Sequence, residues 1–254
     1  MADRSAGTEM PSGNELPGEN RYGFKRSEEE EWLLVHDSAV TNTNPNSMVT
    51  VTINTARICT NMSNVEFKRL VMRLRDTAVL LIRERISDVS RWDSATRIRA
   101  KTWFGRADDA LREKLAIGLP KLQSSMEQLR AEKIIRWDQQ TNQGLTCAIV
   151  VDAGTTDAAV CKPDSHKRFI AIYPHFCTLP DVYVPGNCKL KAVIHECTHY
   201  IDTFNSVDAI YGFGDALARW GQSAPDLAWC NADSIACFIA HFDNIEDFQK
   251  KGIW

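Results

Sequence analysis

An H-E-x-x-H sequence, from His195 to His199, follows directly on the mainly apolar run of residues 190–194. Titratable side chains are costly to bury unless they are paired or bind a metal, so this segment limits the fold more than any other. On an α-helix, residues four positions apart differ by about 40° in azimuth and about 6 Å in height. Both imidazoles can therefore reach one metal ion at the usual zinc–nitrogen distance of about 2.0–2.1 Å. The segment predicts a buried helix with a metal site, rather than two histidines on a charged surface helix.

The residues between the two histidines have different expected roles. Glu196 is turned about 100° from His195, which places it near the metal but outside the ligand shell. That position suits a base that acts on metal-bound water. Cys197 is turned about 200° from His195 and is expected to face the core, so it is not counted as a ligand.

A catalytic zinc site needs a third protein ligand and an open position for water. Asp202 is on the same helical face, but it lies about 10 Å along the axis from His195, too far for a short side chain. We expect Asp202 either to support a histidine from outside the ligand shell or to have no role at the site. Asp208 follows a chain reversal and can return to the metal from outside the helix, so it is the preferred third ligand.

Four short motifs resemble those of one metallopeptidase family and occur in the family's order along the chain. H-E-x-x-H at 195–199 and D-x-x-Y-G at 208–212 resemble the core pattern of the aspzincin metalloendopeptidases, the deuterolysins and peptidyl-Lys metalloendopeptidases. W-F-G at 103–105 and N-A-D-S at 231–234 resemble two further segments of that family. The resemblance covers roughly residues 59–242, which is most of the chain.

The resemblance implies a set of functional residues. One catalytic Zn²⁺ would be held by His195, His199 and Asp208. Glu196 would be the general base, and Tyr211 would be the phenol that stabilises the oxyanion of the tetrahedral intermediate.

Asp233, in the N-A-D-S segment, is implied to lie by the pocket for the residue after the scissile bond and to favour lysine there. A purely structural role stays open, because the helix dipole also stabilises an acid in a first turn. Ahead of the aspartate, the family's Gly-Thr is replaced by Asn205-Ser206. Asparagine is the best replacement for glycine in a left-handed conformation, and serine keeps the hydroxyl, so the reversal is expected to survive.

Helical periodicity predicts an α+β fold that is mainly helical, with a small β-sheet beside the active-site helix. The resemblance makes this a zincin-like metalloprotease domain. A capping-box pattern at Ser63 and Glu66 predicts a long helix that ends near Ile86. A second helical stripe over 111–129 contains Pro120, which is expected to kink or divide it.

The remaining elements follow from shorter patterns. Runs that read as extended or β-rich are 48–59, 145–151 and 169–173. Further helices are expected from Lys189 onward, near 214–222 and near 230–241. The polar stretch 1–47 is predicted to be a flexible leader, and 48–254 to be one zinc metallopeptidase catalytic domain.

The number and spacing of the cysteines indicate the redox compartment in which the protein functions. The eight cysteines include no C-x-x-C pair, which favours disulfide bonds and an oxidising destination. Cys161 with Cys177 is the first expected disulfide, and Cys59 with Cys147 is the second. Residues 1–31 lack the apolar core of a Sec-type signal peptide. A secreted or exported protein is predicted, with a specialised secretion system as one possible route.

Charge and apolar content limit the partners. A net charge of −3 gives no electrostatic reason to expect nucleic acid. No apolar run approaches the roughly 18 residues of a membrane-spanning helix. The sequence therefore predicts a zinc-dependent endopeptidase, a hydrolase that acts on proteins or peptides. The oligomeric state stays open, with a monomer favoured.

Two alternative functions are kept. One is a zinc amidase that acts on bacterial cell-wall peptides, as an effector toxin delivered to rival cells. The other is a catalytically silent interaction module that keeps zinc for structure. Glu196 and Tyr211 argue against the silent module, because structural zinc requires neither residue.

Overall fold

The computed structural model describes residues 56–183 and 186–240. The predicted leader, 1–47, and residues 48–55 of the expected extended run 48–59 lie outside the described residues. The expected boundary between the leader and the catalytic domain therefore stays a prediction.

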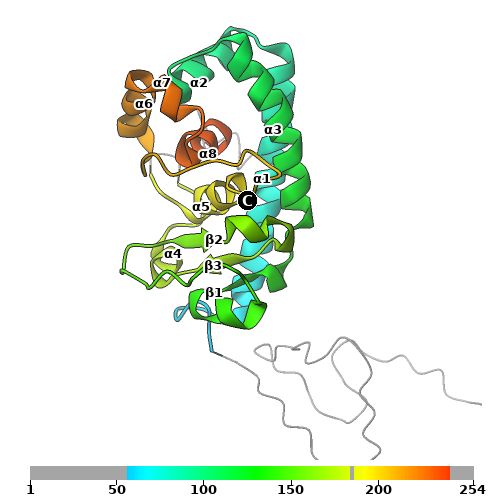
Figure 1. Ribbon diagram of the computed structural model, residues 1–254, viewed down its shortest axis with the longest axis vertical. Helices are drawn as coiled ribbons and strands as arrows, with labels where there is room; N and C mark the ends of the chain where they lie inside the picture. The colour runs from blue at the N-terminus through cyan, green and yellow to red at the C-terminus, as the bar shows by residue number, and fades with distance from the viewer. Residues whose placement is uncertain (1–55, 184–185, 241–254) are drawn as a thin grey trace, which may run out of the picture. The chain divides into compact units, whose positions relative to one another are not determined.

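Helices make up most of the described chain, and the two longest lie side by side along one flank (Figure 1). The α-helices are α1 (Asn64–Arg91), α2 (Ser94–Phe104), α3 (Asp109–Gln128), α4 (Pro174–Thr178), α5 (Lys189–Thr198), α6 (Gly214–Ser223), α7 (Pro225–Ala228) and α8 (Ala232–Ala240). Short 3-10 helices are η1 (Ala131–Lys133), η2 (Trp137–Gln143) and η3 (Lys162–Lys167). The expectation of a mainly helical α+β fold is confirmed.

Local sequence explains the start and the end of α1. The side chain of Ser63 accepts a hydrogen bond from the backbone N–H of Glu66, and the Glu66 carboxylate accepts one from the backbone N–H of Ser63. This is the predicted capping box. The helix continues past the predicted end near Ile86 to Arg91, and it stops where Trp92 adopts a left-handed φ of 50°.

Pro120 was expected to kink or divide its helix, and the division does not occur. α3 runs through Pro120 without interruption over 20 residues. Proline removes one backbone hydrogen bond, but α3 buries Leu115, Leu119 and Leu122 and packs along α1. Tertiary packing supplies most of the stability of a helix in a folded protein, so it outweighs the local preference.

The helices predicted in the C-terminal half correspond to α5, α6 and α8. α2 was not predicted, although its first residues carry a capping signal. The Asp93 side chain accepts hydrogen bonds from the backbone N–H and the hydroxyl of Thr96. An aspartate in this position is typical of a helix N-terminus.

A three-stranded sheet lies beside α5, as expected. Its strands are β1 (Ile134–Arg136), β2 (Ala158–Val160) and β3 (Ile170–Ile172), in the order β1-β3-β2. β1 runs parallel to β3, with Ile134 opposite Ile170. β2 runs antiparallel to β3, with Val160 opposite Ile170. β2 is therefore an edge strand.

Only one of the β-like runs in the described chain forms a strand. The run 169–173 contains β3, but 145–151 contains no strand, so that prediction was wrong. β1 and β2 were not predicted. β1 and β2 have only three residues each, and both form their strand hydrogen bonds with β3. Their positions therefore depend on pairing with a distant segment more than on their own sequence pattern.

Two disulfides are present, and the predicted pairings were wrong. Cys59 is bonded to Cys177, and Cys147 is bonded to Cys161. The four cysteines expected to pair are the ones that do, but with exchanged partners. The fold places the start of α1 against α4, where the Asn61 side chain also donates to the carbonyl of Cys177. Pairing therefore follows tertiary packing, which the spacing of the cysteines does not reveal.

α5 is the most deeply enclosed helix near the centre of the molecule. All ten of its residues are buried, and it packs against α1 and α8. Cys197 on this helix faces the core, as predicted, with no exposed surface. Within residues 56–183 and 186–240, no helix has the length and apolar character needed to cross a membrane.

Candidate metal centre

The structure brings together the three residues expected to bind a metal. His195 lies in the last turn of α5 and His199 lies at its C-terminal cap. Their Nε2 atoms are 3.1 Å apart. Oδ1 of Asp208 is 3.2 Å from Nε2 of His195 and 3.3 Å from Nε2 of His199. The three donor atoms therefore face one common point.

The spacing of these donors fits a tetrahedral zinc ion. Ligand atoms bound at about 2.0–2.1 Å in a tetrahedron are separated from one another by about 3.3 Å. The observed separations of 3.1, 3.2 and 3.3 Å are close to that value. Two imidazole nitrogens and a carboxylate oxygen are also a donor set that zinc accepts. Three protein ligands leave one tetrahedral position for water or substrate.

A residue in the left-handed backbone conformation reverses the chain after α5, and this reversal brings Asp208 to the two histidines. Asn205 has a φ of 50°, so asparagine stands in for glycine here, as the sequence indicated. The backbone N–H of Ser206 then donates to the carbonyl of Thr198 at 3.1 Å, and the hydroxyls of these two residues are 2.7 Å apart. These contacts hold the reversal against the end of the helix.

Both histidines are oriented through their other ring nitrogen. Nδ1 of His195 donates to Oδ1 of Asp233 at 2.6 Å. Nδ1 of His199 is 3.1 Å from both the carbonyl oxygen and the hydroxyl oxygen of Ser206. These contacts keep a proton on Nδ1 and leave the lone pair of Nε2 available for a metal.

The surrounding acids change the protonation of the cluster. Burial by itself lowers the pKa of His195, but hydrogen bonds with Asp208 and Asp233 outweigh burial and raise the pKa to about 10. Burial by itself raises the pKa of Asp208, but hydrogen bonds with the two histidines bring it far below its usual range. The carboxylate is thus ionised at neutral pH, and a metal must displace a proton from His195.

Glu196 lies beside the three donors without being one of them. Its Oε1 is 4.0 Å from Nε2 of His195, and its side chain is buried. Burial is the largest influence on the pKa of Glu196 and raises it above the ordinary value. The carboxylate is therefore more basic than an exposed glutamate, which suits a group that accepts a proton.

Tyr211 lies over the site from the loop that follows Asp208. Its ring stacks on His195 with the ring centroids 6.1 Å apart, and its hydroxyl donates to Oδ2 of Asp208 at 3.0 Å. Partial burial and the charge of Asp208 raise the pKa of the Tyr211 hydroxyl. The hydroxyl therefore stays protonated at neutral pH and can donate a hydrogen bond.

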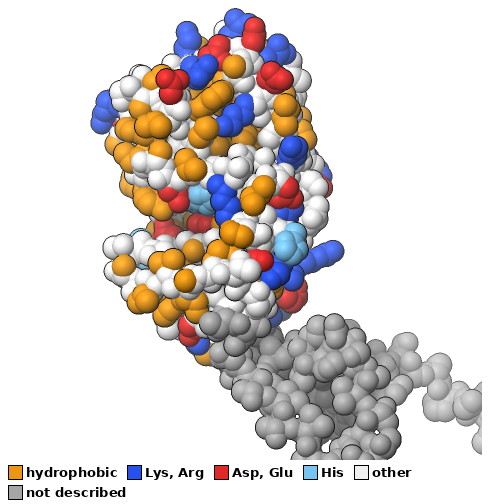
Figure 2. All heavy atoms as spheres, viewed as in Figure 1, with side chains coloured by type: hydrophobic (Ala, Val, Ile, Leu, Met, Phe, Trp, Pro, Cys, Tyr) orange, Lys and Arg blue, Asp and Glu red, His pale blue; other side chains and the backbone are white. Residues whose placement is uncertain are grey.

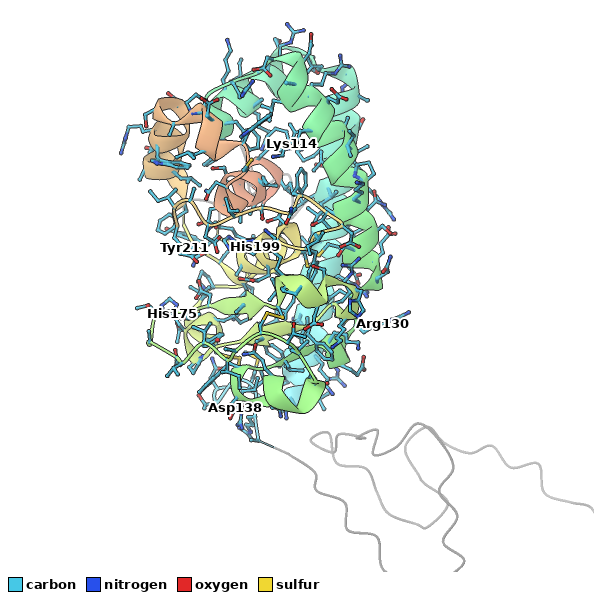
Figure 3. The ribbon with its side chains drawn as sticks, viewed as in Figure 1. Lys114, Arg130, Asp138, His175, His199 and Tyr211 are labelled. Carbon is cyan, nitrogen blue, oxygen red and sulfur yellow. A yellow bond between two sulfur atoms is a disulfide. The ribbon has the colours of Figure 1, made fainter. Side chains whose placement is uncertain are left out.

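One cavity of about 890 Å³ is lined by the three donor residues and by Glu196, Tyr211 and Asp233. Figure 2 shows a hollow on one side of the molecule, with acidic and histidine side chains inside it. β2 contributes to its wall. Tyr211, His175 and His199 all line this cavity, with Tyr211 and His175 toward the left edge of the view in Figure 3.

Several further polar residues of the cavity were not anticipated from the sequence. Among them are Asp157, Lys162, His175, Asn187 and Lys191. Asp157 accepts hydrogen bonds from Nδ1 of His175 at 2.6 Å and from the amide of Asn187 at 2.7 Å. These side chains come from segments with no shared motif, so no sequence signal brings them together.

The expectation that Asp202 supports a histidine was wrong. Its carboxylate makes two hydrogen bonds with the guanidinium of Arg168, one of them at 2.8 Å. α5 ends at Thr198, so Asp202 does not continue the helical face that carries the histidines. This agrees with the other alternative, that Asp202 has no role at the site.

A histidine pair on one buried helix, closed by an aspartate from the next loop, defines a protein of the zinc metallopeptidase class. Comparison with known proteins supports this. The model of the aspzincin family, described as lysine-specific metallo-endopeptidase, matches residues 90–240, which is more than half of the chain. The chain therefore belongs to the aspzincin family and is a zinc metalloendopeptidase.

One solved structure shows how far the fold is shared. A zinc peptidase from Grifola frondosa aligns with a TM-score of 0.52 and 18% sequence identity. The alignment covers 69% of this chain and 94% of that chain. At this identity the likeness concerns the fold alone. No curated protein matches the chain.

Proposed function

We propose that the protein cuts peptide bonds within proteins or peptides by using a single Zn²⁺ bound by His195, His199 and Asp208. One observation carries the proposal. The three donor atoms lie 3.1–3.3 Å apart, beside the buried carboxylate of Glu196 and at the wall of a large cavity.

The chain's own residues supply the proton transfers. A bound Zn²⁺ would supply Lewis acidity, which lowers the pKa of water toward about 7 and polarises a carbonyl. Glu196 would accept a proton from the attacking water on its carboxylate and pass it to the nitrogen of the leaving amine. Its buried position, which raises its pKa, supports this role.

Tyr211 would donate a hydrogen bond to the carbonyl oxygen as negative charge develops there. A donor of this kind contributes about 3–4 kcal/mol to the transition state in comparable sites. The hydroxyl of Tyr211 donates a hydrogen bond to the carboxylate of Asp208. To act on substrate, it must donate to the carbonyl oxygen of the substrate instead. Its exposed position on the loop after Asp208 leaves room for that movement.

The edge strand β2 supports a polypeptide substrate. Ala158, Ala159 and Val160 all line the cavity, and among the described strands β2 pairs with β3 alone. The free backbone groups of an edge strand can bind an extended peptide as an additional strand. A peptide bound there would enter the cavity that contains Glu196 and the three donors.

The preference for lysine is not included in the proposed function. The resemblance implied it through Asp233. The contacts of Asp233 do not favour it, because the carboxylate already accepts hydrogen bonds from His195, Lys191 and the backbone of Gly212.

We infer that the protein is secreted or exported, because its two disulfides are typical of proteins in an oxidising compartment. The cell-wall amidase and the silent zinc module have no separate observation in their favour. Both are distinguished from the peptidase by the same experiment.

The test is cleavage of a mixed peptide library by the full chain with zinc, read by mass spectrometry beside Glu196→Gln. Glutamine keeps the size of the side chain but cannot accept the proton, so turnover is expected to fall by about 10²–10⁴-fold. Zinc content, measured by elemental analysis, is expected to stay at one ion. Unchanged cleavage by the variant would refute the role of Glu196.

Purified cell-wall peptides form the second arm of the test. Release of cell-wall fragments without cleavage of the library would favour the amidase. A folded, zinc-loaded protein that cleaves neither substrate would favour the silent module.

A further inference from the structure

Four carboxylates of the described residues line the cavity, and three of them have a role or a partner that excludes them from selecting a substrate cation. These carboxylates are Asp157, Glu196, Asp208 and Asp233. Asp208 is one of the three proposed zinc ligands, and Glu196 is the proposed base. Asp157 accepts hydrogen bonds from His175 and Asn187. Selection of a lysine side chain requires a carboxylate that can pair with its ammonium group, so Asp233 is the remaining candidate.

Asp233 has three donors around its two oxygens. Oδ1 is 2.6 Å from Nδ1 of His195 and 2.7 Å from Nζ of Lys191. Oδ2 accepts a hydrogen bond from the backbone N–H of Gly212 at 2.7 Å. The side chains of Asp233 and Lys191 are only 3% and 9% exposed. The pair is therefore a buried, satisfied ion pair within the cavity wall.

Lys191 comes from the same helix as the histidines, one turn before His195. Its ammonium occupies the position that a substrate ammonium would need in order to pair with Asp233. A second cation there would meet a like charge at short range in a poorly solvated site, which is unfavourable. Breaking the internal pair would leave a buried charge without a partner, which is also costly.

The wall of the cavity outside the metal centre is balanced in charge. Asp157 and Asp233 are matched by the two lysines that line the cavity, Lys162 and Lys191. Lys162 donates to the backbone carbonyl of Ser206 at 2.8 Å. This balance favours neither basic nor acidic substrate side chains.

We propose that Lys191 is a specificity-determining residue that neutralises Asp233 from within, so that the enzyme favours uncharged side chains after the scissile bond. The inference rests on the proposed function of the same metal centre. It predicts that this chain departs from the lysine specificity named in the description of its family model.

The test compares the wild-type chain with Lys191→Met on a peptide library with zinc, read by mass spectrometry. Methionine keeps a flexible apolar stem but removes the charge. Wild-type cuts are expected to show no enrichment of lysine or acidic residues after the cut. In Lys191→Met, the ratio of kcat/KM for lysine over norleucine at that position is expected to rise by at least about tenfold.

Lys189→Met is the matched control. Lys189 lies on the same helix and pairs with Asp181 at 2.7 Å, but it is not among the residues that line the cavity. This variant is expected to keep the wild-type profile. Ethylammonium added to Lys191→Met is expected to compete with lysine peptides and to restore the wild-type profile.

The outcomes separate this inference from the proposed function. Lysine enrichment in the wild type would overturn the inference and leave the peptidase intact, and enrichment of acidic residues would do the same. An unchanged profile in folded, zinc-loaded Lys191→Met would also overturn it. A wild type that cleaves no peptide would refute the proposed function itself. If Lys191→Met does not fold, the wild-type profile alone decides.

Discussion

Oδ1 of Asp233 lies 2.6 Å from Nδ1 of His195, although the two residues are 38 positions apart in the sequence. Asp233 is in the first turn of α8 and His195 is in the last turn of α5. The two helices pack against each other near the centre of the molecule. The orientation of a proposed zinc ligand therefore depends on how two core helices pack.

Asp233→Asn is expected to weaken zinc binding by about 10–100-fold. Asparagine keeps the shape but loses the charge that stabilises His195, and it leaves Lys191 without its counter-ion. Competition with a chromophoric chelator measures the affinity. Asp202→Asn is the control, because Asp202 is bonded to Arg168 away from the site. If both variants bind zinc as tightly as the wild type, the contact does not orient the ligand.

Zinc affinity is expected to rise with pH. The pKa of His195 is raised to about 10 in the protein, and only the neutral imidazole binds metal. Below that pKa a proton competes with zinc, so the apparent affinity should increase by about tenfold per pH unit near neutrality. Calorimetry in buffers of different ionisation enthalpy would detect the released proton. Binding without proton release at pH 7 would contradict the raised pKa.

The same shift has a consequence for the metal-free protein. Because the pKa of His195 in the folded protein lies above its ordinary value of 6.5, protonation of His195 stabilises the folded state, and the full effect is present below pH 6.5. This stabilisation is lost as the pH rises toward about 10. Chelator-treated protein should therefore lose thermal stability over that interval, whereas the zinc-loaded protein should change less.

Asn205 is expected to tolerate glycine but not alanine. Its φ of 50° is left-handed, a conformation that costs most residues with a Cβ about 1–2 kcal/mol. Asn205→Ala should therefore lower Tm by about 2–4 °C for each kcal/mol lost, while Asn205→Gly should stay near the wild type. Equal melting temperatures for the two variants would argue against the left-handed turn.

The two disulfides should differ in their contribution to stability. Cys59–Cys177 closes a segment of 118 residues, and Cys147–Cys161 closes one of 14. In the chain-entropy account, loops of about these lengths correspond to roughly 4–5 and 3 kcal/mol. Replacing Cys59 and Cys177 by serine should therefore be the more destabilising change in denaturant unfolding.

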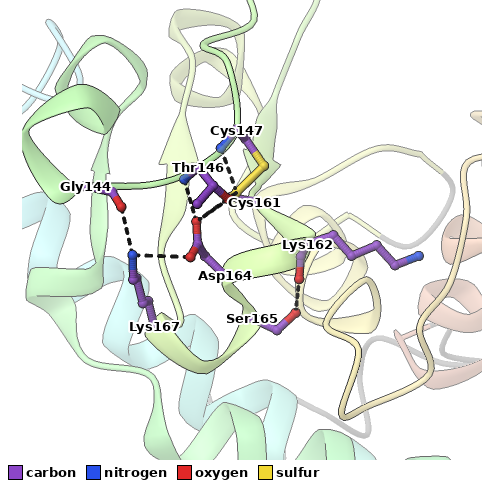
Figure 4. The surroundings of a disulfide bond; sticks show 8 residues. All are labelled: Gly144, Thr146, Cys147, Cys161, Lys162, Asp164, Ser165 and Lys167. Carbon is purple, nitrogen blue, oxygen red and sulfur yellow. Dashed lines mark hydrogen bonds and ion pairs between the residues drawn. A yellow bond between two sulfur atoms is a disulfide. The ribbon is translucent and has the colours of Figure 1, made fainter.

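Hydrogen bonds also support the shorter loop (Figure 4). Oδ2 of Asp164 accepts from the backbone N–H of Thr146 at 2.6 Å, and Lys167 donates to the carbonyl of Gly144 at 2.8 Å. These contacts would keep the loop closed after Cys147 and Cys161 are replaced by serine. A larger loss of stability from this pair than from Cys59 and Cys177 would contradict the loop-length argument.

Local sequence patterns were sufficient for several parts of the molecule. The capping box of Ser63 and Glu66 and the apolar stripe after it specify the start and the buried face of α1. The i and i+4 spacing of His195 and His199 specifies that both rings face one point from one helix. Asn205 indicates a left-handed turn through its own conformational preference. In each case the interacting groups lie within one or two turns of chain, or in a single residue.

Contacts between distant segments were decided only by the tertiary structure. The disulfide partners, the edge position of β2, the Asp157–His175 pair and the Lys191–Asp233 ion pair all join parts of the chain with no shared pattern. The sequence by itself determined the chemistry of the metal-binding helix, because that chemistry needs only local spacing. Tertiary packing determined which groups orient its ligands and which charges face the substrate, because burial makes pairing between distant residues obligatory.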